Sequence, residues 1–166
     1  KMVLEKLNQA EIINLLGSFY EHSPWIAEVL FSQGITSQDN DVGFLAERMK
    51  KIVDASSEEL KLNLLKAHPE LAGKLAISGN LTKDSTAEQA SAGLNQCSKE
   101  EFAEFNKLNF EYTKKFGHPF IIAVKGLTRS EILTSFKERI NNDSKKEFET
   151  ALAEVHKIAL IRLKAL

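Results

Sequence analysis

Apolar residues recur at intervals of three and four along most of the chain, which is the spacing of one face of an α-helix. Sustained alternation of apolar and polar residues is not found, and the chain has only three prolines and eight glycines. The pattern predicts an all-α fold, a single-domain bundle of roughly eight or nine helices. The clearest apolar faces are Phe102, Phe105, Leu108 and Tyr112 in one segment, and Phe148, Leu152, Val155, Ala159, Ile161 and Leu163 in another.

Four helix starts are marked by a capping residue followed three positions later by Glu, a pair that satisfies free backbone amides at a helix start. They are Asn8 with Glu11, Ser56 with Glu59, Ser98 with Glu101 and Thr128 with Glu131. Ser23 followed by Pro24 indicates a further start, because proline is favoured in the first turn. The residues of that helix expected to face the core are Trp25, Val29 and Leu30.

Length and composition favour one domain over residues 1–166, able to bury about two thirds of the surface of the unfolded chain. The 22 basic and 23 acidic residues are interspersed and nearly cancel, so we expect no nucleic-acid or membrane partner. Cys97 is the only cysteine, which excludes an internal disulfide framework. The longest apolar run, Pro119 to Val124, is too short to cross a bilayer, and no clear secretory or peroxisomal signal is found. A cytoplasmic location is therefore expected.

Among the four histidines, His68 has the most informative position. A residue before proline is disfavoured in helical geometry, so one helix is expected to end near Ala67 and Pro69 to open the next. His68 would then cap that helix, whose positive end lowers the pKa of an imidazole and keeps it neutral. A purely structural role is equally consistent with the pattern. For His22 and His156, a surface or packing role is the better interpretation.

Glu88 is similarly open to two interpretations. Ser85-x-x-Glu88 is itself a capping-box pattern, so Glu88 could serve only to close a helix start. Alternatively this start cradles a ligand, with the free amides of Thr86, Ala87 and Glu88 facing an anion or a polar ring. Gln89 would add a hydrogen-bond donor and an acceptor.

A third unusual segment is the apolar run between a Gly-His-Pro break and Gly126. It predicts a buried extended strap, with backbone groups not consumed by a helix, that could bind a heterocycle rich in amide groups. A short buried connection is the equally weighted alternative. The strap residues are Phe120, Ile121, Ile122, Ala123 and Val124. His118, in the second His-Pro dipeptide of the chain, lies just before them.

Five segments, in this order, resemble the family of 2-oxo-4-hydroxy-4-carboxy-5-ureidoimidazoline decarboxylases. They are His68–Gly73, Ser85–Gln89, Phe116–Ile122, Arg129–Leu133 and Ile161–Leu163, and together they extend over most of the chain. The resemblance implies an all-helical fold, usually a homodimer, that acts on the last step from urate to (S)-allantoin. It also implies that no metal or organic cofactor is used.

Carried over by position, the resemblance makes His68 the catalytic proton-transfer residue and Glu88 its acidic partner. It makes Arg162 a candidate to hold the carboxylate of the substrate through a bidentate pair, with Arg129 and Arg139 as alternatives. The other implied substrate contacts are Pro69, Ser85, Thr86, Ala87, Gln89 and the strap Phe120 to Val124. His118 departs from the family, in which many relatives have an aromatic or other apolar residue there, and we do not expect it to be catalytic.

The leading functional hypothesis is therefore a decarboxylase of a small ureidoimidazoline substrate. A helical module that binds a ureide without chemistry is the alternative, and it would leave the spontaneous, racemic reaction unchanged. A metal-dependent hydrolase is disfavoured because the histidines show no His-x-x-x-His or His-Asp ligand spacing.

Overall fold

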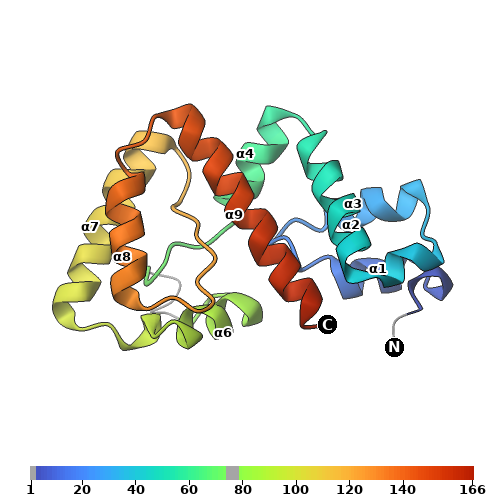
Figure 1. The fold of residues 1–166 in the computed structure, drawn as a ribbon, viewed down its shortest axis with the longest axis horizontal. Helices are drawn as coiled ribbons and strands as arrows, with labels where there is room; N and C mark the ends of the chain where they lie inside the picture. Colours follow the sequence, from blue (N-terminus) through green and yellow to red (C-terminus); the bar gives the residue numbers. More distant parts are fainter. Residues whose placement is uncertain (1–2, 74–78) are drawn as a thin grey trace. The chain divides into compact units, whose positions relative to one another are not determined.

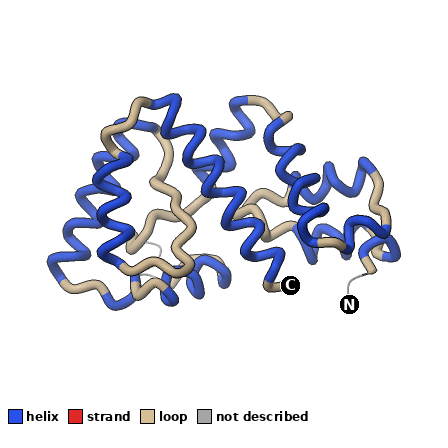
Figure 2. The backbone as a smooth tube through the Cα atoms, viewed as in Figure 1, coloured by secondary structure: helices blue, strands red, loops and turns tan. Residues whose placement is uncertain are grey.

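The computed structural model describes residues 3–73 and 79–166 (Figure 1). This described part contains eight α-helices, three short 3-10 helices and no strand, which confirms the predicted all-α fold (Figure 2). The α-helices are α1 (Gln9–Leu16), α2 (Trp25–Gln33), α3 (Val42–Asp54), α4 (Glu58–Lys66), α6 (Lys83–Ser91), α7 (Lys99–Phe116), α8 (Arg129–Arg139) and α9 (Ser144–Lys164). The 3-10 helices are η1 (Leu4–Lys6), η2 (Ser37–Asn40) and η3 (Leu94–Gln96). None of these helices is long and apolar enough to span a bilayer.

The chain folds into two compact units. The first comprises Lys1–Ala67 and Val155–Leu166, and the second comprises His68–Glu154. Helix α9 therefore contributes residues to both units. The expectation of a single domain over residues 1–166 stays a prediction, and each unit is described by itself below.

Three of the four predicted capping boxes are present, with both reciprocal hydrogen bonds: Asn8 with Glu11, Ser98 with Glu101 and Thr128 with Glu131. The fourth prediction is wrong by one residue. Helix α4 is capped by Ser57, whose hydroxyl accepts a hydrogen bond from the Leu60 N–H at 3.1 Å. The Ser56 hydroxyl instead donates to the Val53 carbonyl at the end of α3, at 2.6 Å. Two adjacent serines thus serve two different helix ends.

Helix α2 begins at Trp25, with Pro24 in the N-cap position, close to the predicted start. The buried residues of this helix are Ile26, Ala27 and Leu30. The expected inward orientation is therefore right for Leu30 and wrong for Trp25 and Val29, which are only half-buried.

In the first unit, His156 connects the C-terminal half of α9 to two other segments. Its Nδ1 lies 2.8 Å from the Tyr20 hydroxyl and its Nε2 lies 3.1 Å from Asp54 Oδ1. Because a carboxylate only accepts, Nε2 carries the proton and Nδ1 accepts from Tyr20. Burial lowers the pKa of His156, against the opposing effect of Asp54. This matches the packing role expected for His156, while His22 is exposed.

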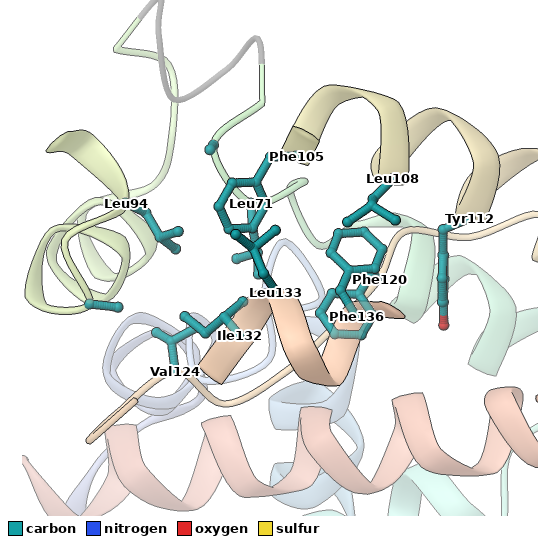
Figure 3. Close-up of a cluster of buried hydrophobic side chains, with 12 residues drawn as sticks. Leu71, Leu94, Phe105, Leu108, Tyr112, Phe120, Val124, Ile132, Leu133 and Phe136 are labelled. Carbon is teal, nitrogen blue, oxygen red and sulfur yellow. The ribbon is translucent and has the colours of Figure 1, made fainter. Parts of the chain in front are cut away.

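The core of the second unit is rich in aromatic residues. The Tyr112 ring of α7 contacts the rings of Phe120 and Phe136, and Phe120 stacks on Phe136 with their centroids 3.9 Å apart (Figure 3). Such contacts add to the free energy gained by burying large apolar surfaces. The same core contains Leu71 and Val124, so it joins the segment after His68, the strap and helices α7 and α8.

Candidate active site

His68 lies in a turn directly after the C-cap of α4, and its side chain is 8% exposed. The prediction that Pro69 opens the next helix is wrong, because the backbone from Pro69 to Gly73 is not helical. His68 therefore does not occupy the N-cap position expected of it. We call the segment His68–Gly73 the histidine loop.

The histidine loop is held by side chains from two helices. Gln89 of α6 accepts from the Ala72 N–H through Oε1 at 3.1 Å and donates to the Glu70 carbonyl through Nε2 at 3.2 Å. Asn109 of α7 donates to the Leu71 carbonyl at 3.0 Å. Both amides are buried. These bonds fix three consecutive residues of a loop that has no secondary-structure partner.

The loop also contains a strained residue. Ala72 has a φ of 51°, in the left-handed region that costs a non-glycine residue about 1 kcal/mol or more. Such a conformation persists only where surrounding contacts enforce it. The hydrogen bond from the Ala72 N–H to Gln89 is one such contact, so the shape of the loop depends on α6.

Helix α6 begins earlier than the sequence pattern predicts. Its N-cap is Thr82, whose hydroxyl accepts from the Ser85 N–H at 3.2 Å, and the Thr86 N–H donates to the Thr82 carbonyl at 2.9 Å. The expected ligand cradle of free amides at Thr86, Ala87 and Glu88 is therefore wrong, because these residues follow the first turn. Helix α6 therefore starts three residues closer to the N-terminus than predicted.

The earlier start places the predicted side chains of α6 on two faces. Ser85 and Gln89 are buried, and Glu88, three residues after Ser85, is half-buried beside them. Thr86 and Ala87 are exposed. Since Gln89 binds the histidine loop directly, the two predicted catalytic residues His68 and Glu88 lie on segments that contact one another.

The strap Phe120–Val124 is non-helical, as predicted, with Phe120, Ile121 and Val124 buried and Ile122 and Ala123 half-buried. Two of its backbone groups are bound by charged side chains: the Ile121 carbonyl accepts from Arg139 Nη1 at 2.7 Å, and the Ala123 N–H donates to Glu154 Oε1 at 3.0 Å. The side chains of Phe120 and Val124 point into the same core as Leu71 of the histidine loop (Figure 3). Three segments singled out by the sequence thus meet in the second unit.

His118 is a buried aromatic packing residue. Its Nδ1–H donates to the Pro119 carbonyl at 3.0 Å, and its ring contacts Tyr112, Phe116 and Phe148. Burial lowers the pKa of His118, so the imidazole is held neutral. That His118 has no catalytic role stays a prediction.

The three arginines considered for the substrate carboxylate have different surroundings. Arg162, in the first unit, donates to the Ser18 carbonyl at 3.1 Å and to Glu21 Oε1 at 3.2 Å. Arg129 pairs with Glu101 at 3.1 Å on a half-buried surface. Arg139 is buried and pairs with Glu147. Its place is within the core, against the strap.

Sequence reasoning missed the buried polar residues that hold these segments. Glu147 and Glu154 lie on the buried stripe of α9 with Ala151, at helical spacing, and Asn109 lies on that of α7. A carboxylate at a core position of an apolar stripe is the signal that could have found them, because such a group requires a partner. The sequence does not reveal which partner it has.

A separate cavity of about 530 Å³ lies in the second unit, around α6, η3 and the start of α7. Its walls include Gln89, Leu94, Cys97 and Phe102, but neither His68 nor Glu88. Burial raises the pKa of the Cys97 thiol, which donates weakly to the Leu94 carbonyl at 3.4 Å. Cys97 is therefore an ordinary, unactivated thiol.

Within residues 3–73 and 79–166, no cluster of three or more histidine, cysteine, aspartate or glutamate side chains could hold a metal ion. We therefore base the roles proposed for the site residues on the polar side chains and backbone groups described above. The absence of a metal or organic cofactor from the reaction stays a prediction.

Comparison with known proteins identifies the family. The family model for OHCU decarboxylase matches residues 5–164. A 2-oxo-4-hydroxy-4-carboxy-5-ureidoimidazoline decarboxylase from Haloferax volcanii is 38% identical over 96% of this chain and 91% of its own length. A uric acid degradation bifunctional protein from Bacillus subtilis is 39% identical over 96% of this chain, which spans 32% of that protein. A crystal structure of (S)-allantoin synthase superposes with a TM-score of 0.76 at 34% identity, over 98% of this chain and 52% of that one.

These similarities first define the class: the chain is an all-helical carboxy-lyase. It belongs to the OHCU decarboxylase family, in which OHCU denotes 2-oxo-4-hydroxy-4-carboxy-5-ureidoimidazoline.

Proposed function

We propose that this chain decarboxylates 2-oxo-4-hydroxy-4-carboxy-5-ureidoimidazoline to (S)-allantoin in urate degradation, with His68 as proton-transfer residue and Glu88 as its acidic partner. The names of the relatives support the reaction and its pathway. The observation that carries the residue assignment is the contact between the histidine loop and α6 through Gln89. It brings two sequence motifs with acid–base groups to one side of the second unit.

The reaction requires few groups from the protein. The bond between ring carbon C4 and the carboxyl carbon breaks, carbon dioxide leaves, and the electron pair is delocalised over the neighbouring C5=N bond of the ring. A proton then adds to C5, which bears the ureido group, from one face only if the product is a single enantiomer, and the hydroxyl on C4 loses its proton to become the carbonyl of allantoin. The substrate supplies the electron sink, so the protein needs to orient the ring, stabilise the developing charge and transfer a proton.

His68 is suited to proton transfer because imidazole titrates near neutral pH. It can take the proton of the substrate hydroxyl or supply the proton that adds to carbon. Glu88, half-buried on the neighbouring helix, would orient the imidazole or the substrate and stabilise the protonated ring. Ser85 and Gln89 share the face of α6 with Glu88, and Pro69 follows His68 directly.

The strap would bind the ureide by its backbone. In an extended segment, the N–H and C=O of one residue point to the side opposite those of its two neighbours. In the proposed extended strap, Arg139 and Glu154 bind the groups of Ile121 and Ala123 on one side, so the groups of Ile122 would point to the other. A donor and an acceptor side by side match the N–H and C=O pair of a ureide.

The test is a time course with freshly generated substrate, in which carbon dioxide release and optical activity are followed together. We expect His68→Ala and Glu88→Ala to lose about a hundred- to ten-thousand-fold in kcat, the usual value of positioned proton transfer, while far-UV circular dichroism stays helical. His22→Asn is the matched control, since His22 is exposed and has a φ of 48° that asparagine tolerates. Full activity of purified His68→Ala would refute the assignment. A spontaneous rate and racemic product from the unmodified protein would instead favour the ureide-binding module.

The homodimer, the cytoplasmic location and the contact of Arg162 with the substrate carboxylate belong to the same proposal. The oligomeric state follows from sedimentation equilibrium over a range of protein concentrations, in which a single monomer mass throughout would refute the dimer. The location follows from fractionation of the source cells.

A further inference from the structure

The proposed chemistry does not use the most buried charged cluster of the second unit. It comprises Arg139 at the end of α8, Glu147 near the start of α9 and Tyr112 of α7. The Glu147 and Tyr112 side chains are fully buried, and Arg139 is 9% exposed. Burial, reinforced by Glu147, raises the pKa of the Tyr112 hydroxyl, so Tyr112 remains a donor.

The cluster has a closely defined geometry. Arg139 Nε donates to Glu147 Oε1 at 2.7 Å, and Nη2 lies 2.6 Å from the same oxygen. The Tyr112 hydroxyl donates to this oxygen at 2.5 Å, and Asn142 Nδ2 donates to the other oxygen, Oε2, at 3.0 Å. Three hydrogen bonds therefore hold the carboxylate, and its contacts with Nε and Nη2 orient the guanidinium.

The remaining nitrogen of that guanidinium binds the strap. Arg139 Nη1 donates to the Ile121 carbonyl at 2.7 Å, and the guanidinium carbon lies 4.4 Å from the centre of the Phe120 ring. Arginine can make these contacts at once because its five donors lie in one plane whose face stacks on aromatic rings. A lysine ammonium can reach either the carboxylate or the carbonyl, but it cannot stack.

A second anchor lies two residues further along the strap. Glu154, about two turns after Glu147 on α9, accepts the Ala123 N–H through Oε1 at 3.0 Å. Stability alone does not account for these buried charges, because well-packed apolar residues commonly replace a buried ion pair without loss. These buried charges are explained if they fix the position of the strap backbone.

We infer that Arg139, oriented by Glu147, and Glu154 are positioning residues that hold the strap on one side so that the backbone groups of Ile122 meet the substrate on the other. The inference rests on the proposed function, in which the strap binds the ureide. Neither Arg139 nor Glu154 touches the substrate in this scheme. Each acts through one backbone hydrogen bond on either side of Ile122.

The test uses Glu154→Ala, which removes the acceptor, and Glu154→Gln, whose amide oxygen can still accept from Ala123. Glu149→Ala is the matched control, because Glu149 is exposed on the same helix. Arg139→Lys tests the other anchor. We expect KM to rise about tenfold or more in Glu154→Ala and Arg139→Lys, because the strap binds the ureide before and during the reaction. Glu154→Gln should remain within about threefold of the unmodified enzyme.

KM distinguishes positioning from a general loss of structure. A variant that is partly unfolded has fewer active molecules, which lowers the apparent kcat and leaves KM unchanged. Amide hydrogen exchange gives a second readout that does not depend on activity. The Ala123 amide should exchange faster in Glu154→Ala than in Glu154→Gln, with the core amides of α7 unchanged in both.

The outcomes separate this inference from the proposed function. Unchanged KM values, or a Glu154→Gln variant as impaired as Glu154→Ala, would overturn the positioning role even where the enzyme is fully active. Unchanged exchange at Ala123 would show that Glu154 does not hold the strap. If the unmodified protein lacks decarboxylase activity but exchange at Ala123 responds as expected, the proposed reaction fails and the anchoring of the strap stands.

Discussion

The substitution Gln89→Met tests the role of Gln89 most directly, because methionine has a similar volume. The family resemblance makes Gln89 a substrate contact, whereas in the structure its side chain binds the histidine loop. The change removes the hydrogen bonds to the Ala72 N–H and to the Glu70 carbonyl. Ala72 is buried, so its N–H is left without a partner, whereas Glu70 is half-buried and its carbonyl can be hydrated. If Gln89 served the substrate alone, its replacement would leave stability unchanged.

The expected magnitude follows from those two bonds. An unpaired buried N–H costs about 1–3 kcal/mol, and the loss of an ordinary hydrogen bond costs about 1 kcal/mol. The sum is about 2–4 kcal/mol. The free energy of unfolding of a domain is usually about 5–15 kcal/mol, so this loss is large but leaves the protein folded at 25 °C. Relaxation of Ala72 out of its left-handed conformation would return about 1–2 kcal/mol of this loss.

Urea unfolding followed by circular dichroism measures this loss as a lower midpoint at an unchanged m-value. Asn109→Leu removes the neighbouring bond to Leu71, and the double variant with Gln89→Met should be non-additive because both side chains hold one loop. A loss below about 0.5 kcal/mol in Gln89→Met, the range of an ordinary surface substitution, would refute the argument that Gln89 shapes the loop. A substrate contact by Gln89 would then be its remaining role.

Two further predictions concern single side chains. Because the folded-state pKa of His118 is lowered by burial, the unfolded chain binds its proton first, so stability should fall as pH decreases below about 6.5, the ordinary value for histidine. His118→Phe should flatten the pH dependence of the unfolding free energy between pH 7 and 5, and an unchanged slope would show that other groups set it. Arg162→Lys should raise KM about tenfold if Arg162 holds the substrate carboxylate through a bidentate pair, since lysine cannot form one. An unchanged KM together with a lower midpoint of unfolding would limit Arg162 to its bonds with Ser18 and Glu21.

Local sequence chemistry predicted most of the helical fold. A capping box involves residues only three positions apart, so three of four were placed correctly without knowledge of the rest of the chain. The errors arose where two candidates competed. Thr82 and Ser85 can each cap α6, and the earlier residue does so, which adds three residues to the helix. At Ser56 the hydroxyl was already used by α3.

For the candidate site, the sequence predicted the separate segments but not the contacts between them. The histidine loop, α6 and the strap each have a recognisable local pattern, but the bonds that join them connect residues far apart in sequence. Gln89 binds a loop 17 to 19 residues earlier, and Glu154 binds a backbone amide 31 residues earlier. A periodicity rule also counts Glu147 and Glu154 as interruptions of an apolar stripe, although both side chains are buried within it.

The histidine loop and the strap, the two segments proposed to hold the substrate, both need hydrogen-bond partners for their backbone groups, and both obtain them from helix side chains. A helix satisfies its own backbone groups, but the histidine loop and the strap are buried without secondary structure, so each buried N–H and C=O needs another partner. Helices supply these partners as side chains: Gln89 and Asn109 for the loop, Arg139 and Glu154 for the strap. Substitutions at these four positions should therefore alter the reaction without removing any reacting group. Because the anchors of the two segments are separate, defects in the loop and in the strap should combine additively, unless the segments move as one body.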